Sequence, residues 1–169
     1  FNVTSIGEYT FSGCSGLTSI TIPESVTSIK AYAFYGCTSL KDLRIEDGNT
    51  TLDLSDNSSA WEAYRSLFND CPLETLYLGR NLSYTSRNYR YSPFYNQDEL
   101  KSLTISNSVT SIGDYAFCGC SGLTSITIPE SVTSISDYAF SGCSGLTSIT
   151  IPESVTSIGE GAFRNCSGL

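Results

Sequence analysis

The sequence has no histidine, no methionine and only nine Lys and Arg among its 169 residues. Without His, the chain holds no Ser-His-Asp or Cys-His catalytic arrangement, no His-ligated zinc and no histidine-based pH switch. The nine cations stand against 17 Asp and Glu, which gives a formal net charge of −8. Proteins that hold nucleic acid through its phosphates need clustered cations, so we expect no nucleic acid partner.

Long apolar runs are missing as well. No segment approaches the roughly 18 residues that cross a bilayer, so we expect no membrane insertion by this segment. The chain opens without the basic-then-apolar pattern of a signal peptide, and it has no initiating Met. We therefore expect a segment of a longer protein whose targeting sequence lies elsewhere.

One pattern repeats along the whole chain. The unit Leu17 to Ser39 reads LTSITIPESVTSIKAYAFYGCTS, and later units start at Leu40, Leu73, Leu100, Leu123, Leu146 and Leu169. The spacings are 23, 33, 27, 23, 23 and 23 residues, so the coils 40–72 and 73–99 are irregular. A fixed period of this length is typical of a solenoid, and no linker interrupts it. We predict a single domain, 1–169, of about seven coils of 23–33 residues.

Each unit can be assigned local structure. In residues 19–22, Ile alternates with Ser and Thr, the period of a half-buried strand, and Pro23 ends the strand because it has no N–H to donate. A second short extended stretch follows at 26–29, and Ala33 with Phe34 indicates one turn of helix or 3₁₀ that buries the Phe ring. No unit can cover its own apolar face, so stability must come from stacking against neighbouring units.

The pattern L-x-x-I-x-I at a 23-residue period resembles a leucine-rich repeat. The run from Leu123 to Gly145, with IP-E-S-V-T-S-I, A-F and G-C, is similar to the BspA-like surface-antigen subclass. The resemblance implies an α/β-type, mostly β horseshoe solenoid with a parallel sheet on its concave side. It also implies a secreted or cell-surface role in attachment to host or microbial proteins. Composition and spacing by themselves indicate only the solenoid.

The seven cysteines form a second pattern. Six of them hold one position of successive units: Cys14, Cys37, Cys71, Cys120, Cys143 and Cys166. They could form disulfides, as in many secreted chains, or a column of small buried residues. The column is favoured, because stacking spaces in-register Cβ atoms by about 4.8 Å rather than the roughly 3.8 Å of a disulfide. Cys118 lies outside the column and is expected to be exposed.

Polar residues alternate with the inward strand residues and predict one exposed stripe. Its first positions are Ser19, Asp42, Thr75, Ser102, Ser125 and Ser148, and its second positions are Thr21, Arg44, Tyr77, Thr104, Thr127 and Thr150. On a leucine-rich repeat these side chains line the concave face. The stripe is either a ligand groove, with Arg44 and Tyr77 as its only large members, or a solvated β face. Regular Thr arrays also resemble ice-binding surfaces, although Arg44 and Tyr77 interrupt this one.

The middle of the chain is rich in Tyr and Arg, the residue types that anchor protein interfaces. Its members are Tyr77, Arg80, Tyr84, Arg87, Tyr89, Arg90, Tyr91 and Tyr95. Together with Arg44 they form the candidate binding set. The alternative is that the aromatic rings pack back onto the irregular coil. Phe94 and Phe68 are expected to take the place of the repeat Phe in the core.

The acidic segment 46–59 allows two interpretations. Calcium would use the oxygen ligands of Asp47, Asn49, Asp53 and Asp56, but the spacing does not match an EF-hand, so a solvated loop is favoured. The following residues 61–68 have the spacing of a short amphipathic helix. Asn-x-Ser/Thr sequons occur at Asn2, Asn49, Asn57, Asn81 and Asn165, and they matter only if a eukaryote secretes the chain.

The sequence predicts no catalytic residue, no metal site and no cofactor, because no nucleophile–base pair, phosphate loop or isolated acid stands out. The predicted function is an extracellular or cell-surface module that binds a host matrix or microbial surface protein. Two alternatives remain: a structural spacer or stalk, and a carbohydrate-binding surface. Because the coil ends lack caps, end-to-end self-association is also expected.

Overall fold

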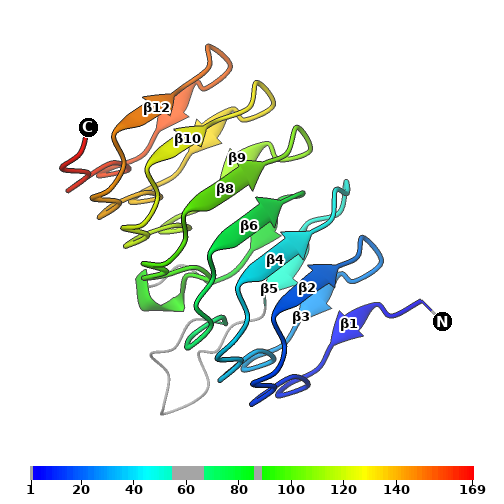
Figure 1. The fold of residues 1–169 in the computed structure, drawn as a ribbon. Coiled ribbons are helices and arrows are strands. Elements are labelled where there is room, and N and C mark those ends of the chain that lie inside the picture. Colours follow the sequence, from blue (N-terminus) through cyan, green and yellow to red (C-terminus); the bar gives the residue numbers. More distant parts are fainter. Residues whose placement is uncertain (1, 55–66, 86–88) are drawn as a thin grey trace.

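The computed structural model describes residues 2–54, 67–85 and 89–169. Over these residues the chain is a solenoid of stacked coils, with the two termini at opposite ends of the stack (Figure 1). A first row of strands comprises β2 (Ser19–Ile22), β4 (Asp42–Ile45), β6 (Thr75–Leu78), β8 (Ser102–Ile105), β10 (Ser125–Thr127) and β12 (Ser148–Thr150). The predicted mostly β solenoid with parallel strands is confirmed.

A second row of shorter strands lies behind the first. It comprises β1 (Ser5–Ile6), β3 (Ser28–Ile29), β5 (Leu52–Leu54), β7 (Leu82–Ser83), β9 (Ser111–Ile112), β11 (Ser134–Ile135) and β13 (Ser157–Ile158). One 3₁₀ helix, η1 (Tyr89–Tyr91), is the helical element of the described residues. With six strands in the first row and seven in the second, the described residues agree with the predicted coil number.

The register of the first row follows the repeat, even through the irregular coils. Thr21 pairs with Arg44, Arg44 with Tyr77, and Tyr77 with Thr104. Since side chains alternate along a strand, these four residues share one face. The opposite face carries the Ile and Leu residues of the strands, which are buried in β4, β6 and β8 and partly buried at Ile20 of β2 and Ile149 of β12. The two longer coils therefore keep the strands in register and place their extra residues elsewhere.

A column of Phe rings runs through the core. Its members are Phe11, Phe34, Phe68, Phe94, Phe117, Phe140 and Phe163, with neighbouring centroids 5.3–5.6 Å apart and nearly parallel planes. Phe68 and Phe94 are fully buried, which confirms that they replace the repeat Phe in the irregular coils. Residues 61–66 of the predicted helix lie outside the described residues.

The turn that carries each Phe is a series of hydrogen-bonded turns rather than a regular helix. In the unit of Phe34, the N–H of Ala33 donates to the carbonyl of Lys30 and that of Cys37 to the carbonyl of Phe34. Tyr32 has a φ of 56° and Gly36 a φ of 72°, both in the left-handed region. Tyr9, Tyr115 and Tyr138 repeat the Tyr32 conformation. The positive φ at Tyr is unusual for a side chain of this size, and stacking of Tyr9 on Tyr32 and of Tyr115 on Tyr138 holds these turns together.

The cysteine column is confirmed, and all seven cysteines are free thiols. Five members are buried, and each donates its S–H to the carbonyl of the Phe in the preceding unit, at 3.1–3.3 Å: Cys37, Cys71, Cys120, Cys143 and Cys166. Cys14, in the first coil, is exposed. The expectation of an exposed Cys118 is wrong, because this residue is partly buried and burial raises the pKa of its thiol.

The strand-to-strand hydrogen bonding is interrupted at one place in each row. The two interruptions lie one coil apart along the stack. The first row divides into β2-β4-β6-β8 and β10-β12, and the second into β1-β3-β5-β7 and β9-β11-β13. The coil that carries β8 and β9 is therefore paired toward the N-terminus on one row and toward the C-terminus on the other. Between β7 and β9, side chains replace the ladder: Asn81 accepts from the N–H groups of Thr110 and Ser111, at 2.9 and 3.3 Å.

Candidate functional site

The outward side chains of the first strand row form a surface that we call the polar face. Most of its residues are Ser or Thr, and Arg44 and Tyr77 are its large members, as predicted. The guanidinium carbon of Arg44 lies 3.8 Å from the centroid of the Tyr77 ring. The pairing of β4 with β6 places the two side chains directly opposite each other. This contact is a cation–π stack built from facing strand positions.

Asp47 fixes the far end of the Tyr77 ring. Both carboxylate oxygens of Asp47 accept from the Tyr77 hydroxyl, at 3.0 Å, and Ser106 donates a further hydrogen bond to Asp47. The Ser106 hydroxyl, the Tyr77 hydroxyl and the charge of Arg44 lower the pKa of Asp47, against a smaller opposing effect of burial. Asp47 therefore stays ionised and orients the platform on which Arg44 lies.

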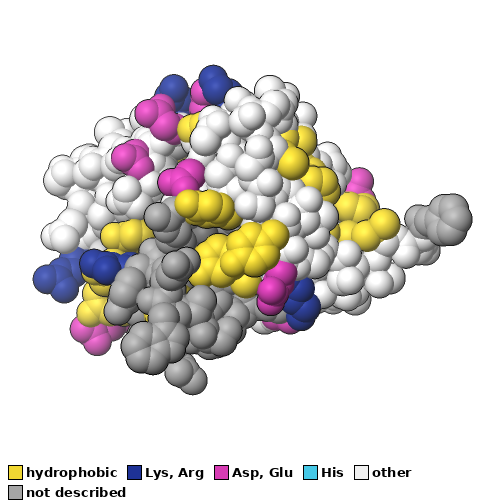
Figure 2. All heavy atoms as spheres, turned by 90° about the horizontal axis from the view of Figure 1, so that it is seen from below, with side chains coloured by type: hydrophobic (Ala, Val, Ile, Leu, Met, Phe, Trp, Pro, Cys, Tyr) yellow, Lys and Arg dark blue, Asp and Glu magenta, His cyan; other side chains and the backbone are white. Residues whose placement is uncertain are grey.

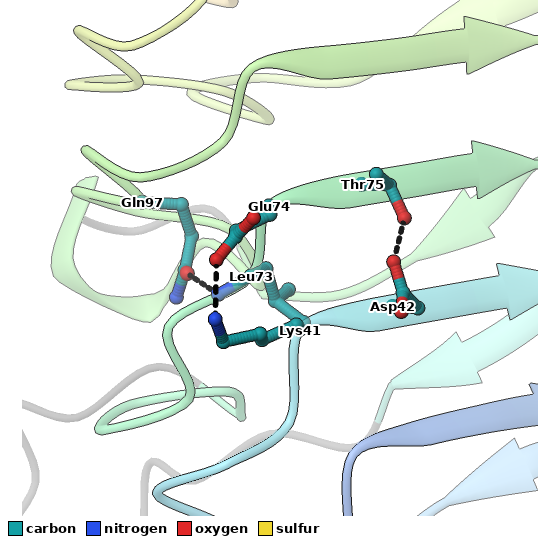
Figure 3. A network of polar contacts seen from close by, with 6 residues as sticks. All are labelled: Lys41, Asp42, Leu73, Glu74, Thr75 and Gln97. Atoms are coloured by element: carbon teal, nitrogen blue, oxygen red, sulfur yellow. Dashed lines mark hydrogen bonds and ion pairs between the residues drawn. The ribbon is translucent and has the colours of Figure 1, made fainter.

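Further polar contacts join neighbouring coils at the edge of this face (Figure 3). The Thr75 hydroxyl donates to Asp42 at 2.5 Å, from the strand position two residues before Tyr77. At the entry to β4 and β6, Lys41 and Glu74 form an ion pair of 2.7 Å that is solvent-exposed. Such a pair stabilises little and can be screened by salt. It nevertheless lowers the pKa of Glu74 and raises that of Lys41, so both groups stay charged.

The polar face is hollowed at its centre. A groove of about 280 Å³ is lined by the outward residues of β2, β4, β6 and β8: Ser19, Thr21, Asp42, Arg44, Thr75, Tyr77, Ser102 and Thr104. A second groove of about 660 Å³ lies where the ladder between β8 and β10 is interrupted, and it shares Ser102 and Thr104 with the first. Apart from Asp42, Arg44 and Tyr77, the outward residues that line the first groove are Ser and Thr.

Arg80 does not lie on the surface. It is fully buried, and its guanidinium donates to the carbonyl oxygens of Glu24 (3.0 Å) and Pro23 (2.9 Å), two coils away. Burial lowers the pKa of Arg80, and the carboxylates of Glu24 and Glu46 oppose this shift. The prediction of a binding anchor does not fit this position, because the buried side chain joins its own coil to the turn after β2.

Tyr84 also packs inward. Its hydroxyl donates to the carbonyl of Asp114 at 3.0 Å, and its ring packs against the core. A Cβ added at Gly113 would come within 2.5 Å of the Tyr84 hydroxyl oxygen, so the glycine leaves the space that this ring fills. Burial raises the pKa of Tyr84 well above its usual range. The position of Tyr84 therefore agrees with the alternative interpretation, in which the ring packs against the solenoid, and not with a role as an exposed binding residue.

The remaining tyrosines of the segment form a cluster at the surface. We call Tyr89, Tyr95 and Tyr115 the tyrosine cluster: the Tyr89 centroid lies 5.0 Å from that of Tyr95 and 6.4 Å from that of Tyr115. The exposed Arg90 lies over the Tyr89 ring at 5.6 Å. Tyr91 is half-buried, and Arg87 lies outside the described residues. The structure therefore brings together only part of the predicted segment.

Beside the tyrosine cluster is a groove of about 530 Å³. It is lined by Thr38, Asn69, Asp70, Cys71, Pro72, Tyr95, Asn96, Gln97, Asp98 and Glu99. Seen from the side shown in Figure 2, hydrophobic side chains gather near the centre of the surface, with acidic and basic side chains at the edge of this patch. The surface thus offers one polar and one aromatic region.

Gln97 has a role that the sequence interpretation missed. It occupies the cysteine position of its unit, is almost fully buried, and its amide donates to the carbonyl of Phe68 at 3.0 Å. Its carbonyl oxygen accepts from the N–H of Leu73 at 3.3 Å (Figure 3). The alignment of the units could have revealed it, because Gln97 is the residue that stands where the other units have Cys.

The calcium interpretation involves residues that already have hydroxyl partners. Asp47 accepts from Tyr77 and Ser106, and Asp53 accepts from Ser83 at 3.3 Å. Asp56 lies outside the described residues. Within the described ranges, no three His, Cys, Asp or Glu side chains are grouped as metal ligands would be.

A family model described as the BspA type leucine-rich repeat region matches the chain in six copies, over residues 1–58 and 88–169. The chain belongs to this family. The resemblance drawn from the repeat motif is thus confirmed. The stretch between the matches, 59–87, falls in the two irregular coils 40–72 and 73–99 and includes Tyr77, Arg80, Tyr84 and Arg87. These two coils therefore depart from the family pattern.

Solved structures similar to this BspA-type chain include several bacterial leucine-rich repeat proteins. A leucine-rich repeat protein of T. pallidum is 29% identical with a TM-score of 0.69, and the match covers 99% of this chain and 72% of that one. A leucine-rich cell surface protein of Faecalibacterium prausnitzii is 30% identical with a TM-score of 0.57, and the match covers 99% and 50%. A leucine-rich repeat protein of Bacteroides ovatus, 22% identical with a TM-score of 0.55 and coverage of 98% and 51%, shows the fold alone.

No curated protein matches the chain. The chain spans about half the length of two of its structural relatives. In the part of the chain that the structure describes, no helix is long and apolar enough to cross a membrane. What the comparisons establish is a leucine-rich repeat scaffold of the type found in bacterial surface proteins.

Proposed function

We propose that this chain is a cell-surface or secreted module that binds an extracellular protein and mediates attachment. The observation that carries the proposal is the Arg44–Tyr77 stack, held by Asp47 on a polar face whose other residues are Ser, Thr and Asp42. Arg and Tyr are enriched among residues that dominate interface energetics, and a pair fixed in advance loses less entropy on binding. The cell-surface description of the Faecalibacterium relative supports an extracellular location.

The test compares capture of host matrix and plasma proteins by the unchanged chain and by two double variants. One variant removes the polar-face pair (R44A and Y77A), and the other removes the half-buried Tyr89 of the tyrosine cluster and the exposed Arg90 that lies over its ring (Y89A and R90A). The proposal expects a partner that is retained by the unchanged chain and the Y89A/R90A variant but lost with the polar-face variant. Circular dichroism checks that all three proteins are folded.

Other outcomes assign other functions. Loss only with Y89A/R90A would move the interface to the tyrosine cluster. Retention by both variants would exclude both surfaces as the principal contact. If folded proteins capture no partner, the scaffold acts as a spacer, and the attachment proposal is wrong.

A carbohydrate ligand is the second candidate, because of the groove of about 530 Å³ beside Tyr95. An aromatic ring next to amide and carboxylate groups such as Asn69 and Asp98 is a combination that can stack on a sugar and bond its hydroxyls. Glycan-array binding that is lost in Y95A but kept in R44A would support this candidate. A complete lack of array signal would exclude it.

A further inference from the structure

Arg44 is positioned with little freedom. It lies in the middle of β4 between Leu43 and Ile45, which are both buried and fix the backbone. Its guanidinium lies over the Tyr77 ring at 3.8 Å, and the Tyr77 hydroxyl is held by Asp47. The charged group is thus held in place before any ligand arrives, which lowers the entropic cost of binding.

The stack leaves the hydrogen-bond donors of Arg44 available. The five N–H groups of a guanidinium point outward in its plane, so a ring on one face does not block them. The nearby carboxylates have other partners: Asp42 accepts from Thr75, and Asp47 accepts from Tyr77 and Ser106. Within the described residues, Arg44 forms no ion pair; the ion pair of this region joins Lys41 and Glu74.

The space around Arg44 suits a small planar anion. The groove of about 280 Å³ that Arg44 helps to line is also lined by Thr21, Ser102 and Thr104, whose short side chains offer hydroxyl groups. Two negative charges, on Asp42 and Asp47, lie close to the site and would repel a dianion such as phosphate more strongly than a singly charged group. A planar monoanion that can accept two parallel N–H bonds is a carboxylate.

We infer that Arg44 is the anchor of a carboxylate-binding subsite in the polar-face groove. The inference rests on the proposed function and gives the chemistry of the ligand that this face takes. One carboxylate oxygen pair accepts from the Arg44 fork, and the neighbouring hydroxyls bond the flanking polar groups of the ligand. The carboxylate can belong to an acidic side chain of a protein or to an acidic sugar, and the experiment separates the two sources.

The test is an NMR titration with small probes of known composition. N-acetyl-glutamic acid amide, which carries one carboxylate, is compared with N-acetyl-glutamine amide, its neutral counterpart. The acidic probe should shift the Arg44 side-chain N–H signal and the backbone signals of Thr21 and Tyr77 in a saturable way, with a dissociation constant on the order of millimolar. The neutral probe should cause no saturable shift. A third titration with the methyl glycoside of N-acetylneuraminic acid shows whether a sugar carboxylate binds more tightly than the peptide carboxylate.

Two variants make the test specific. Arg44→Lys keeps the charge but loses the planar fork, and it should weaken binding of the acidic probe at least about fivefold. Arg164→Gln removes an exposed arginine of the turn at 160–165, which does not line the groove, so it should leave binding unchanged. Equal shifts with both amide probes, equal binding by Arg44→Lys, or shifts centred away from Arg44 would each overturn the inference.

The outcome is separable from that of the proposed function. If a partner is captured through the polar face but the acidic probe does not bind at Arg44, the carboxylate subsite is wrong and the attachment function stands. If the acidic probe binds at Arg44 but no partner is captured, the subsite stands and the attachment function is wrong.

Discussion

Single residues in this solenoid act mainly through the backbone groups of the neighbouring coil. The buried cysteines donate to the carbonyl of the Phe in the unit before, and Gln97 makes the same contact with an amide. Arg80 reaches further, to Pro23 and Glu24. These side chains give turn carbonyl groups an additional donor: the carbonyls of Phe34, Phe68 and Pro23 also accept from backbone N–H groups of their own turns.

Removing the Gln97 amide should destabilise the chain. Gln97→Ala removes one of the two donors to the Phe68 carbonyl, which keeps the N–H of Cys71, and we expect a loss of about 0.5–1.5 kcal/mol in the free energy of unfolding. Gln97→Cys restores the donor that the other units use and should recover part of the loss. Urea unfolding of the three proteins measures this, and equal stability of the Ala and Cys variants would contradict the role given to the amide.

The buried thiols should make the protein less stable at alkaline pH. Burial raises the pKa of Cys71 and of Cys143 to about 12, whereas an unfolded Cys ionises near pH 8.5. The folded state therefore binds more protons between these values. Stability is fully present below about pH 8.5, and each thiol removes about 1.4 kcal/mol per pH unit as the pH rises toward 12.

The measurement is the free energy of unfolding at pH 8 and pH 10.5, under reducing conditions. Cys143→Ala should flatten the pH dependence, because it removes one of the two buried thiols whose pKa is raised to about 12. A pH dependence unaffected by Cys143→Ala would show that other groups cause it.

At the level of elements, each coil supplies one ring to a column and depends on the coils above and below for its burial. The inner Phe residues have a stacking neighbour on both sides, and Phe163 contacts only Phe140 within this column. Where the strand ladder between β7 and β9 is interrupted, Asn81 and Tyr84 connect the coils instead. The longer coils are therefore held by side chains that the regular repeat does not need.

The Phe column gives a position-dependent prediction. Phe140→Ala should lower the free energy of unfolding by about 3–5 kcal/mol, because the ring is fully buried between Phe117 and Phe163. Phe163→Ala should cost less, about 1–2 kcal/mol, since its ring is only partly buried. Denaturant unfolding compares the two, and a loss below about 1 kcal/mol for Phe140→Ala would contradict the stacked arrangement.

In the whole molecule, the interruptions of the two strand rows are staggered. The coil with β8 and β9 is joined to the N-terminal coils through β6 and to the C-terminal coils through β11. The Phe column crosses both interruptions: Phe94 and Phe117 stack at 5.5 Å across the one between β7 and β9, and Phe117 and Phe140 at 5.4 Å across the one between β8 and β10. A cut between coils at either interruption therefore still breaks the strand ladder of the other row and a contact in the Phe column.

This arrangement predicts cooperative unfolding. Native-state hydrogen exchange should give the same opening free energy for amides of β4 and of β11. The coil with β8 and β9 pairs with both sides, so unfolding of one side removes contacts that the other side needs. A gap of more than about 2 kcal/mol between the two groups would show that the halves unfold independently. Chemical denaturation followed by tyrosine fluorescence and by circular dichroism should give coincident transitions for the same reason.

The sequence by itself determined the repeat, the parallel strands, the facing positions of Arg44 and Tyr77, and the core roles of Phe68 and Phe94. It could do so because a fixed period and alternating strand side chains translate directly into register. Only the tertiary structure decided which Tyr and Arg residues of the irregular coil are exposed. Arg80 and Tyr84 turn inward because they meet carbonyl groups and the space at Gly113, which belong to other coils. The bond from Tyr77 and Ser106 to Asp47 likewise joins residues 30 and 59 positions apart, a distance over which no local pattern extends.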